Sequence, residues 1–247
     1  MTVSFVIPFH NEEKNCGKMI ERVVNYGKQN RLLFEVIPVN DRSTDGTGEI
    51  LDRLAYKYKG IVIPIHRNKD SVEKGNTMGK ALIEGTKRGK GNFIIWTMGD
   101  LADDTKTYGD IIKKLSEGYD IVFGSRYMPG GSRGNLDPLK AFLSSWGTIL
   151  ARALFGIPVH DITNAFRGFR KEIFRRLTLT STGFSISPEF AIKAHLAGFR
   201  LGEVPTVYTN RVKGVSSFKL FKMTRSYLSL YTQLMLNYKL PKINDQK

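Results

Sequence analysis

The sequence is poor in cysteine, in long apolar runs, and in acidic residues relative to basic ones. Its single cysteine, Cys16, excludes an intrachain disulfide and a cysteine-rich metal site, and indicates residence in the reducing cytoplasm. No apolar run reaches the roughly 18–20 residues that a membrane-spanning helix needs, so we expect no transmembrane segment. The 247 residues are 41% hydrophobic and 25% charged, which fits one folded domain with a small appendage and excludes wholesale disorder.

Several common catalytic and nucleotide-binding devices are also missing. No G-x-G-x-x-G follows an apolar run, and residues 75–81 are one residue short of a P-loop, with Ala81 in place of its metal-binding hydroxyl. The four histidines show no metal-ligand spacing, and there is no G-x-S-x-G elbow. These absences argue against a hydrolase or a zinc enzyme.

Basic residues are in clear excess. The 38 Lys and Arg against 23 Asp and Glu give a net charge of +15, which predicts a polyanionic partner such as nucleic acid, anionic lipid or a phosphorylated substrate. Basic residues in the last part of the chain alternate with apolar ones, which favours a membrane surface. Zinc-finger spacing and aromatic ribonucleoprotein motifs are absent, so we expect no nucleic acid partner.

Apolar runs and helical patterns alternate through the first half. The patterns predict strands over 3–8, 34–39, 61–65, 92–98 and 120–124, and helices over 12–28, 47–58, 77–88 and 107–117. This alternation predicts an α/β fold with a mostly parallel sheet flanked by helices. Ligands bind at the carboxyl ends of the strands in such sheets, so we expect the polar loops 40–47 and 99–104 to line one cleft.

Two amphipathic helices are predicted in the second half, over 139–155 and 218–238. We divide the chain into a domain at 1–217, which includes the first helix, and a basic amphipathic helix and tail at 218–247. The apolar face of either helix packs on the core of the domain or lies on a membrane, with basic residues toward anionic lipid. The residues alone leave both interpretations open.

Charged residues in loops suggest how an anionic ligand is held. Asp100, with Asp103 or Asp104, could supply oxygens to a divalent cation on a nucleotide diphosphate, although an aspartate after a strand often only caps the next helix. Arg126, Arg133 and Arg211 lie in or near glycine-containing loops, where a forked guanidinium group suits phosphate.

Taken in chain order, these segments resemble the motifs of the family 2 glycosyltransferases of the GT-A fold. The closest resemblance is to the branch of dolichol-phosphate mannose synthases and polyprenyl-phosphate sugar transferases, and it covers residues 3 to about 219. The matching segments are Pro-Phe-His-Asn-Glu at 8–12, Asn-Asp-Arg-Ser-Thr-Asp-Gly-Thr at 40–47, Gly79 with Ala81 and Gly85, Gly-Ser-Arg-Tyr at 124–127, Asp-Ile-Thr-Asn-Ala-Phe-Arg at 161–167, Glu-Val-Pro at 203–205, and Arg211 with Gly214 and Ser216.

The resemblance implies roles for individual residues. The nucleotide would be bound by Pro8, Phe9, His10, Asn11, Glu12, Val39, Asp41, Gly79, Met98, Gly99 and Asp100. The catalytic residues would be Asp161, Arg126 and Asp100. Arg126, Arg133 and Arg211 would hold the acceptor phosphate or the donor diphosphate. The implied cofactor is Mg²⁺ or Mn²⁺ on Asp100, with Asp103 or Asp104 as a second ligand.

Two departures from the family pattern affect this interpretation. Met98 stands where the family has the first carboxylate of its Asp-x-Asp motif, and Asn40 replaces the first Asp of the second motif. The implied metal site thus lacks its first carboxylate, and loop arginines could carry part of the diphosphate charge.

The function implied by the resemblance is an inverting hexose transfer, of mannose before glucose. The donor would be GDP-mannose or UDP-glucose, and the acceptor a polyprenyl or dolichyl phosphate at the cytoplasmic face of a membrane. Two alternatives stay open: a family 2 glycosyltransferase with a glycan or protein acceptor, and a non-catalytic nucleotide-binding module on a membrane.

Overall fold

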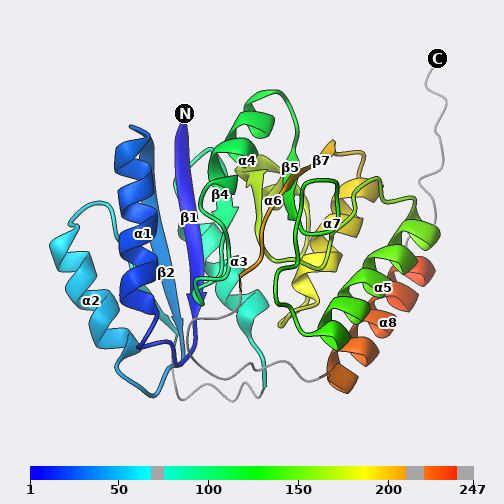
Figure 1. Ribbon diagram of the computed structural model, residues 1–247, viewed down its shortest axis with the longest axis horizontal. Helices are drawn as coiled ribbons and strands as arrows, with labels where there is room; N and C mark the ends of the chain where they lie inside the picture. Colours follow the sequence, from blue (N-terminus) through cyan, green and yellow to red (C-terminus); the bar gives the residue numbers. More distant parts are fainter. Residues whose placement is uncertain (68–74, 210–219, 238–247) are drawn as a thin grey trace.

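A computed structural model describes residues 1–67, 75–209 and 220–237 (Figure 1). In this part of the chain seven strands form one sheet in the order β3-β2-β1-β4-β6-β5-β7. The strands are β1 (Thr2–Phe9), β2 (Leu33–Asp41), β3 (Ile65–Arg67), β4 (Phe93–Trp96), β5 (Ile121–Ser125), β6 (Arg167–Arg170) and β7 (Leu201–Pro205). The helices are α1 (Cys16–Gln29), α2 (Thr47–Lys57), α3 (Met78–Arg88), α4 (Thr107–Ser116), α5 (Pro138–Phe155), α6 (Lys171–Arg176), α7 (Ile186–Leu196) and α8 (Leu220–Asn237).

The pairing of the strands brings four loops to one edge of the sheet. β1 is parallel to β2 and β4, and β6 runs antiparallel to both β4 and β5. The chain therefore leaves β1, β2, β4 and β5 at the same edge. The expected mixed, mostly parallel sheet is confirmed, and so is the shared position of the loops after β2 and β4.

Each face of the sheet carries its own hydrophobic core. Alternate residues of β1 show this directly: Phe5 and Ile7 pack with α1, α2 and α4, whereas Val6 packs with α3, α5, α7 and α8. The period of two along a strand buried on both faces explains why β1 is apolar almost throughout. The core is contiguous on each side, so the site loops rest on a rigid base.

One strand predicted from the sequence needs correction, and two strands were not predicted. The third strand was expected over 61–65, but the structure places β3 at Ile65–Arg67, because Pro64 has no N–H to give to the ladder. Ahead of it, Val62 makes only an isolated bridge to Val36. The short strands β6 and β7 escaped prediction. In β6 the buried Arg167 and a glycine interrupt any apolar pattern.

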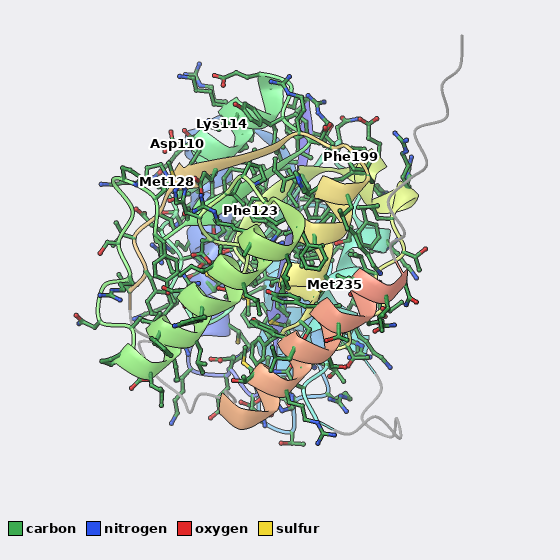
Figure 2. The ribbon with its side chains drawn as sticks, turned by 90° about the vertical axis from the view of Figure 1, so that its right-hand side faces the viewer. Asp110, Lys114, Phe123, Met128, Phe199 and Met235 are labelled. Atoms are coloured by element: carbon green, nitrogen blue, oxygen red, sulfur yellow. The ribbon has the colours of Figure 1, made fainter. Side chains whose placement is uncertain are left out.

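The two amphipathic helices pack side by side at one end of the molecule (Figures 1 and 2). α8 buries its apolar stripe, Tyr227, Leu230, Tyr231 and Leu234, in the core. α5 does the opposite, since it buries small residues such as Ala141 and Ala151 and exposes large ones. No helix in the described part of the chain is long and apolar enough to cross a membrane.

Candidate active site

Hydrogen bonds between the loops after β1 and β2 hold these loops together. The His10 ring bonds through Nδ1 to the carbonyl oxygen of Asp41 at 2.7 Å. Asn11 accepts from the Thr44 backbone N–H at 2.8 Å, and the Glu12 N–H donates to the Thr47 hydroxyl at 2.9 Å. His10, Asn11 and Glu12, three of the residues that the family resemblance implies for nucleotide binding, are therefore fixed against the loop after β2 in one preassembled surface.

Asp41 lies at the centre of a polar cluster beside this surface. Its carboxylate is almost fully buried and contacts Arg67 Nη1 at 2.5 Å, Arg42 Nε at 3.3 Å and the Thr77 hydroxyl at 2.7 Å. Arg67 comes from β3, and Thr77 directly precedes α3. Sequence analysis missed Arg67 and Thr77 as partners because they come from separate segments, whereas Arg42 directly follows Asp41 in the 40–47 motif.

Three residues with a strained, left-handed backbone conformation lie at the same edge of the sheet. Asn11, Arg42 and Leu101 follow β1, β2 and β4 respectively, and have φ values of 54°, 59° and 66°. Non-glycine residues adopt this left-handed region at an energetic cost, and the cost is typical of functional sites. The Leu101 carbonyl is held by Arg22 Nη1 at 3.3 Å.

Two glycines of the expected nucleotide site are explained by close packing. A Cβ on Gly99 would collide with the Phe9 ring and lie 2.9 Å from the Pro8 carbonyl oxygen. A Cβ on Gly79 would lie 2.5 Å from the Ser181 carbonyl oxygen. Gly99 thus lets the end of β4 approach the end of β1, and Gly79 lets α3 begin against the loop before α7.

Asp100 and Asp103 have different roles in the turn after β4. Asp100 accepts from the Ala102 N–H at 3.2 Å and lines a cavity. Asp103 turns back under the strand end, where its Oδ2 accepts from the Thr97 hydroxyl at 2.9 Å and the Met98 N–H at 2.8 Å. Burial, with the nearby charge of Asp100, raises the pKa of Asp103 to about 7.

The acidic residues of the turn after β4 can hold a divalent cation only together with a bound diphosphate. Among the described residues no group of three or more His, Cys, Asp or Glu side chains converges on a point. Met98 brings no carboxylate, one oxygen of Asp103 is occupied, and Asp104 caps the Lys106 N–H at 3.0 Å. Mg²⁺ often takes one or two carboxylates together with substrate phosphates. Asp100 can therefore be one ligand of an ion that a bound diphosphate also coordinates. The turn alone does not surround an ion with protein ligands.

Arg126 and Asp161 form a buried, two-pronged ion pair beside the cavity. The distances are 2.7 Å from Nε to Oδ2 and 3.1 Å from Nη2 to Oδ1, and the Arg126 backbone N–H also donates to Oδ2 at 3.2 Å. Burial disfavours the charged guanidinium, but Asp161 outweighs it and holds the pKa of Arg126 above its ordinary value. In the described part of the chain, Nη1 has no partner.

The loop that carries Asp161 is fastened at both ends. Glu203 of β7 accepts from the His160 backbone N–H at 2.8 Å. Arg167, fully buried, donates to the carbonyl oxygens of Ile162 at 3.1 Å, Ala165 at 3.3 Å and Ser187 at 2.8 Å, and also to that of Asn164. Burial lowers the pKa of Arg167 to about 9. Its donors are committed to the backbone, which makes it a structural arginine.

A cavity of about 390 Å³ lies between α5, α8 and the ends of the strands. Its polar lining comes from Asp100, Arg126, Lys140, Ser144, Thr163, Asn164, Ser187, Tyr208 and Thr224. The apolar lining comes from Met78, Met98, Leu136, Phe142, Leu143, Trp146, Leu150, Phe184, Met223, Tyr227, Leu228 and Tyr231. Sequence motifs located the polar groups, but the apolar chamber exists only because two distant helices pack together.

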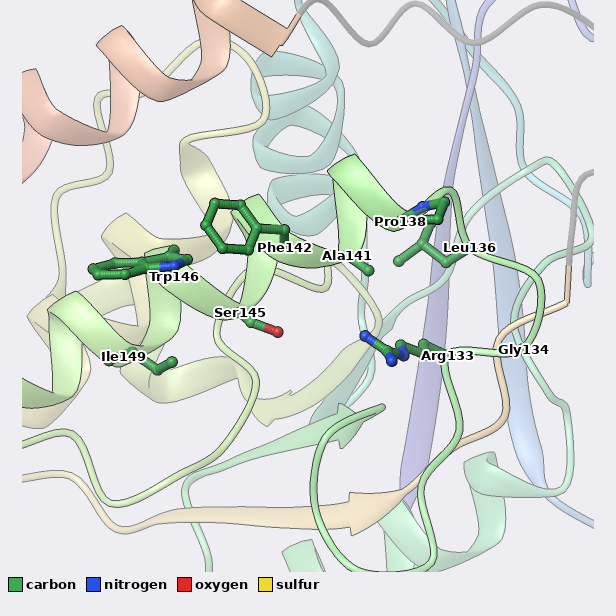
Figure 3. Close-up of a pocket in the computed structure, with 9 residues that line it drawn as sticks. All are labelled: Arg133, Gly134, Leu136, Pro138, Ala141, Phe142, Ser145, Trp146 and Ile149. Atoms are coloured by element: carbon green, nitrogen blue, oxygen red, sulfur yellow. The ribbon is translucent and has the colours of Figure 1, made fainter.

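Arg133 and Arg126 line different hollows. Arg133 lines a neighbouring groove of about 520 Å³ beside α5, and the two hollows share Leu136, Phe142 and Trp146 in their walls. Figure 3 shows its side chain directed toward α5 from the facing loop. The structure thus separates two arginines that sequence analysis grouped together. Arg211, the third, lies outside the described residues.

The segment after β7 connects the remaining loops of the site. The Thr206 N–H donates to the Ser125 carbonyl oxygen at 3.0 Å, and the Tyr208 N–H donates to that of Ser132 at 2.8 Å. The Thr209 N–H donates to the Ala102 carbonyl oxygen at 3.0 Å. One short segment therefore aligns the Arg126 loop with the Asp100 turn.

Comparison with known proteins shows the family of the chain. The profile of Glycosyl transferase family 2 matches residues 4–178. The chain is 30% identical over 217 residues to a polyprenol monophosphomannose synthase from Mycolicibacterium smegmatis, covering 85% of this chain and 78% of the relative. It is 31% identical over 222 residues to a dolichol-phosphate mannosyltransferase from Pyrococcus furiosus, covering 89% of this chain but only 60% of that longer relative.

Solved structures with a similar fold are more distant in sequence. Glucosyl-3-phosphoglycerate synthase from Mycobacterium tuberculosis, in complex with Mn²⁺, uridine diphosphate and glucosyl-3-phosphoglycerate, has a TM-score of 0.70 at 16% identity, covering 94% of this chain and 79% of that one. Mannosyl-3-phosphoglycerate synthase from Rubrobacter xylanophilus has a TM-score of 0.70 at 16% identity, covering 99% and 77%. The likeness establishes the GT-A fold.

Proposed function

The chain belongs to glycosyl transferase family 2, and from that premise we propose that it transfers a hexose from a nucleotide sugar to a polyprenyl phosphate with inversion. Two relatives at about 30% identity carry names of mannose transfer to polyprenol or dolichol phosphate, which supports this acceptor and favours mannose over glucose. GDP-mannose is accordingly the first candidate donor, and UDP-glucose is the second.

The observation that carries the proposal is the composition of the cavity beside Asp100 and Arg126. A glycan or a polar peptide would leave most of that apolar lining without a matching partner. A polyprenyl phosphate is complementary to it, because it has one anionic head and a long hydrocarbon chain. Nη1 of Arg126 has no hydrogen-bond partner among the described residues and is available to the phosphate, and the apolar wall formed by α5 and α8 accommodates isoprene units.

The reaction needs charge placement more than proton transfer. An acceptor phosphate oxygen is already anionic near pH 7 and attacks the anomeric carbon. The bond from that carbon to the diphosphate breaks, and its electron pair leaves with the nucleoside diphosphate. Arg126 stays charged through this step because Asp161 faces it, and Asp161 keeps the guanidinium in one orientation. Positioning and fixed charges can lower the barrier without a general base.

A divalent cation fits the donor side of this site. Asp100 would hold Mg²⁺ or Mn²⁺, and the ion would supply positive charge to the leaving diphosphate. The surface formed by the loops after β1 and β2, with Asp41 beside it, holds the nucleoside. Asp103 acts on this side only indirectly, by fixing the Met98 N–H and thus the start of the turn.

The exposed stripe on α5 supports a place for the enzyme on a membrane. Leu139, Phe142, Trp146 and Ile149 are each more than half exposed, and they recur at the spacing of one helix face. Leu228 and Met235 on the adjacent α8 are half exposed as well. We infer that this end of the molecule lies on the cytoplasmic face of a membrane, where it meets an acceptor too apolar to dissolve in water.

A transfer assay tests the proposal directly. Purified protein is incubated with a short polyprenyl phosphate, Mg²⁺ or Mn²⁺, and radiolabelled GDP-mannose or UDP-glucose in separate reactions. We expect label from one donor in the organic phase and less of it after chelation. Folded protein that labels a glycan or protein acceptor but no lipid would overturn the acceptor assignment. Binding of nucleotide without any transfer would favour the non-catalytic alternative.

A further inference from the structure

Ser187 carries a buried hydroxyl group that has no hydrogen-bond partner in the part of the chain that the structure describes. It lies in the first turn of α7 and is 1% exposed. Its Oγ makes no hydrogen bond within the described residues. Buried hydroxyl groups almost always find a partner, because leaving one unpaired costs folding free energy. An exception of this kind requires an explanation in terms of a ligand or of function.

The position of this hydroxyl points to a ligand. Ser187 lines the same cavity as Asp100 and Arg126. Two residues earlier, Ser185 has an ordinary environment, since its hydroxyl bonds to that of Ser226 at 2.5 Å. A serine at this helix start can therefore find a partner, and of these two serines the one that lines the cavity is without a partner among the described residues.

Ser187 is also held in place relative to the reacting groups. Arg167 Nη1 donates to the Ser187 carbonyl oxygen at 2.8 Å, and Nη2 of the same guanidinium donates to the Ile162 carbonyl oxygen at 3.1 Å. Ile162 follows Asp161, which fixes Arg126. One buried arginine thus fastens the Ser187 backbone to the loop of the ion pair, so its hydroxyl is preorganised toward whatever the cavity binds.

The chemistry of the group limits the ligand. A lone neutral hydroxyl that can donate and accept suits another neutral hydroxyl, whereas the anionic phosphate already has Arg126. Isoprene units have no polar atoms. We propose that Ser187 hydrogen-bonds a hydroxyl of the transferred hexose and helps to select the sugar. This inference rests on the proposed function, because it takes the cavity to be the place where the hexose meets the acceptor.

The test combines Ser187→Ala with a matched control, Ser185→Ala. Removing an unpaired buried hydroxyl should raise Tm by about 1–4 °C, whereas removing the Ser185 hydroxyl should lower it. With GDP-mannose or UDP-glucose, whichever wild type uses, Ser187→Ala should lower kcat/KM by about tenfold. Ser185→Ala should stay close to wild type in kcat/KM.

Deoxy donors identify the hydroxyl that is bound. The 2-, 3-, 4- and 6-deoxy analogues of the active donor are each assayed with wild type and Ser187→Ala. One analogue should be poor with wild type and lose nothing further in the variant, because both changes remove the same hydrogen bond. A higher Tm with unchanged kcat/KM for every donor would overturn the inference and leave a water as the partner. If the wild-type protein transfers no sugar at all, the result would instead contradict the proposed function.

Discussion

The proposed donor side and the proposed acceptor side of the site are built on different physical principles. On the donor side, backbone and side-chain hydrogen bonds tie the loops after β1 and β2, and three left-handed residues lie at strand ends. On the acceptor side, one buried ion pair lies against an apolar chamber enclosed by two helices. The first surface suits a ligand that is polar throughout. The second suits a ligand with one charged end.

The difference explains how one enzyme can bring two unlike substrates together. Loops held by hydrogen bonds at the edge of a sheet are rigid and offer fixed polar groups. A gap between packed helices excludes water and strengthens the few charges that line it. Asp100 and Arg126 line the same cavity, so the hydrogen-bonded loops and the apolar chamber adjoin at these two residues.

The largest expected effect separates the two arginines that sequence analysis grouped. Arg126→Ala should reduce kcat by about 10²–10³, because it removes a preorganised charge from the reacting centre. Arg133→Ala is the matched control, since Arg133 lines the neighbouring groove and not the cavity of Arg126, and should change kcat by less than about fivefold. Steady-state transfer kinetics decide the matter. An equal loss of kcat in both variants would contradict the distinction between the two arginines.

The next effect concerns the exposed face of α5. The double change Phe142→Ser and Trp146→Ser should weaken binding to vesicles with anionic lipid by about tenfold or more, because each side chain buries apolar area in the lipid. Tyr56→Ser is the control, since Tyr56 is 89% exposed but lies on α2, at the other side of the molecule (Figure 1). Vesicle sedimentation measures both. Unchanged binding by the double variant would remove α5 from the membrane contact.

A smaller effect is expected on the donor side. Thr77→Val removes the hydroxyl that bonds Asp41, and should weaken nucleotide binding by about tenfold while the acceptor KM stays the same. Thr86→Val, in the same helix region, removes a hydroxyl that bonds Trp96 Nε1 in the core. That control should cost stability and leave nucleotide affinity intact. Calorimetric titration with nucleotide distinguishes them, and equal weakening would place the Asp41 cluster outside the donor site.

The smallest effect is a pH dependence of stability that comes from Asp103. Its pKa is raised to about 7, so the folded protein holds this proton more tightly than the unfolded chain. That stabilisation is complete below the ordinary pKa of aspartate and is lost as the pH rises through about 7, with a slope of roughly 1 kcal/mol per pH unit. Asp103→Asn should remove this slope. Denaturant unfolding of both proteins between pH 5 and 8 tests it, and parallel curves would contradict it.

Much of the donor side could be predicted from the sequence because its determinants are local. A predicted strand that is followed directly by polar residues indicates a loop at the carboxyl end of that strand. Asn11, Asp41 and Asp100 all lie in such a position. What the pattern could not give was the set of partners of Asp41, since Arg67 and Thr77 come from other segments. The strand over 61–65 was misplaced for a local reason, the missing N–H of Pro64.

The acceptor side was predictable only in part because its determinants are tertiary. The sequence identified Arg126 and Asp161 separately and also located both amphipathic helices. The chamber depends on the packing of α5 against α8, which lie far apart in the chain. The unpaired hydroxyl of Ser187 has no sequence signal, because a serine at the start of a helix is common and is usually satisfied locally.

The most direct test of the account is the dependence of transfer on the hydrocarbon chain of the acceptor. With the active donor, kcat/KM is compared for methyl phosphate and farnesyl phosphate, in wild type and in Leu143→Trp, which fills part of the cavity. We predict a preference of wild type for farnesyl phosphate of about 100-fold or more, since burial of each CH₂ contributes about 0.8 kcal/mol, and a much smaller preference in the variant. Equal kcat/KM for the two acceptors in wild type would contradict the claim that the apolar cavity holds the lipid chain.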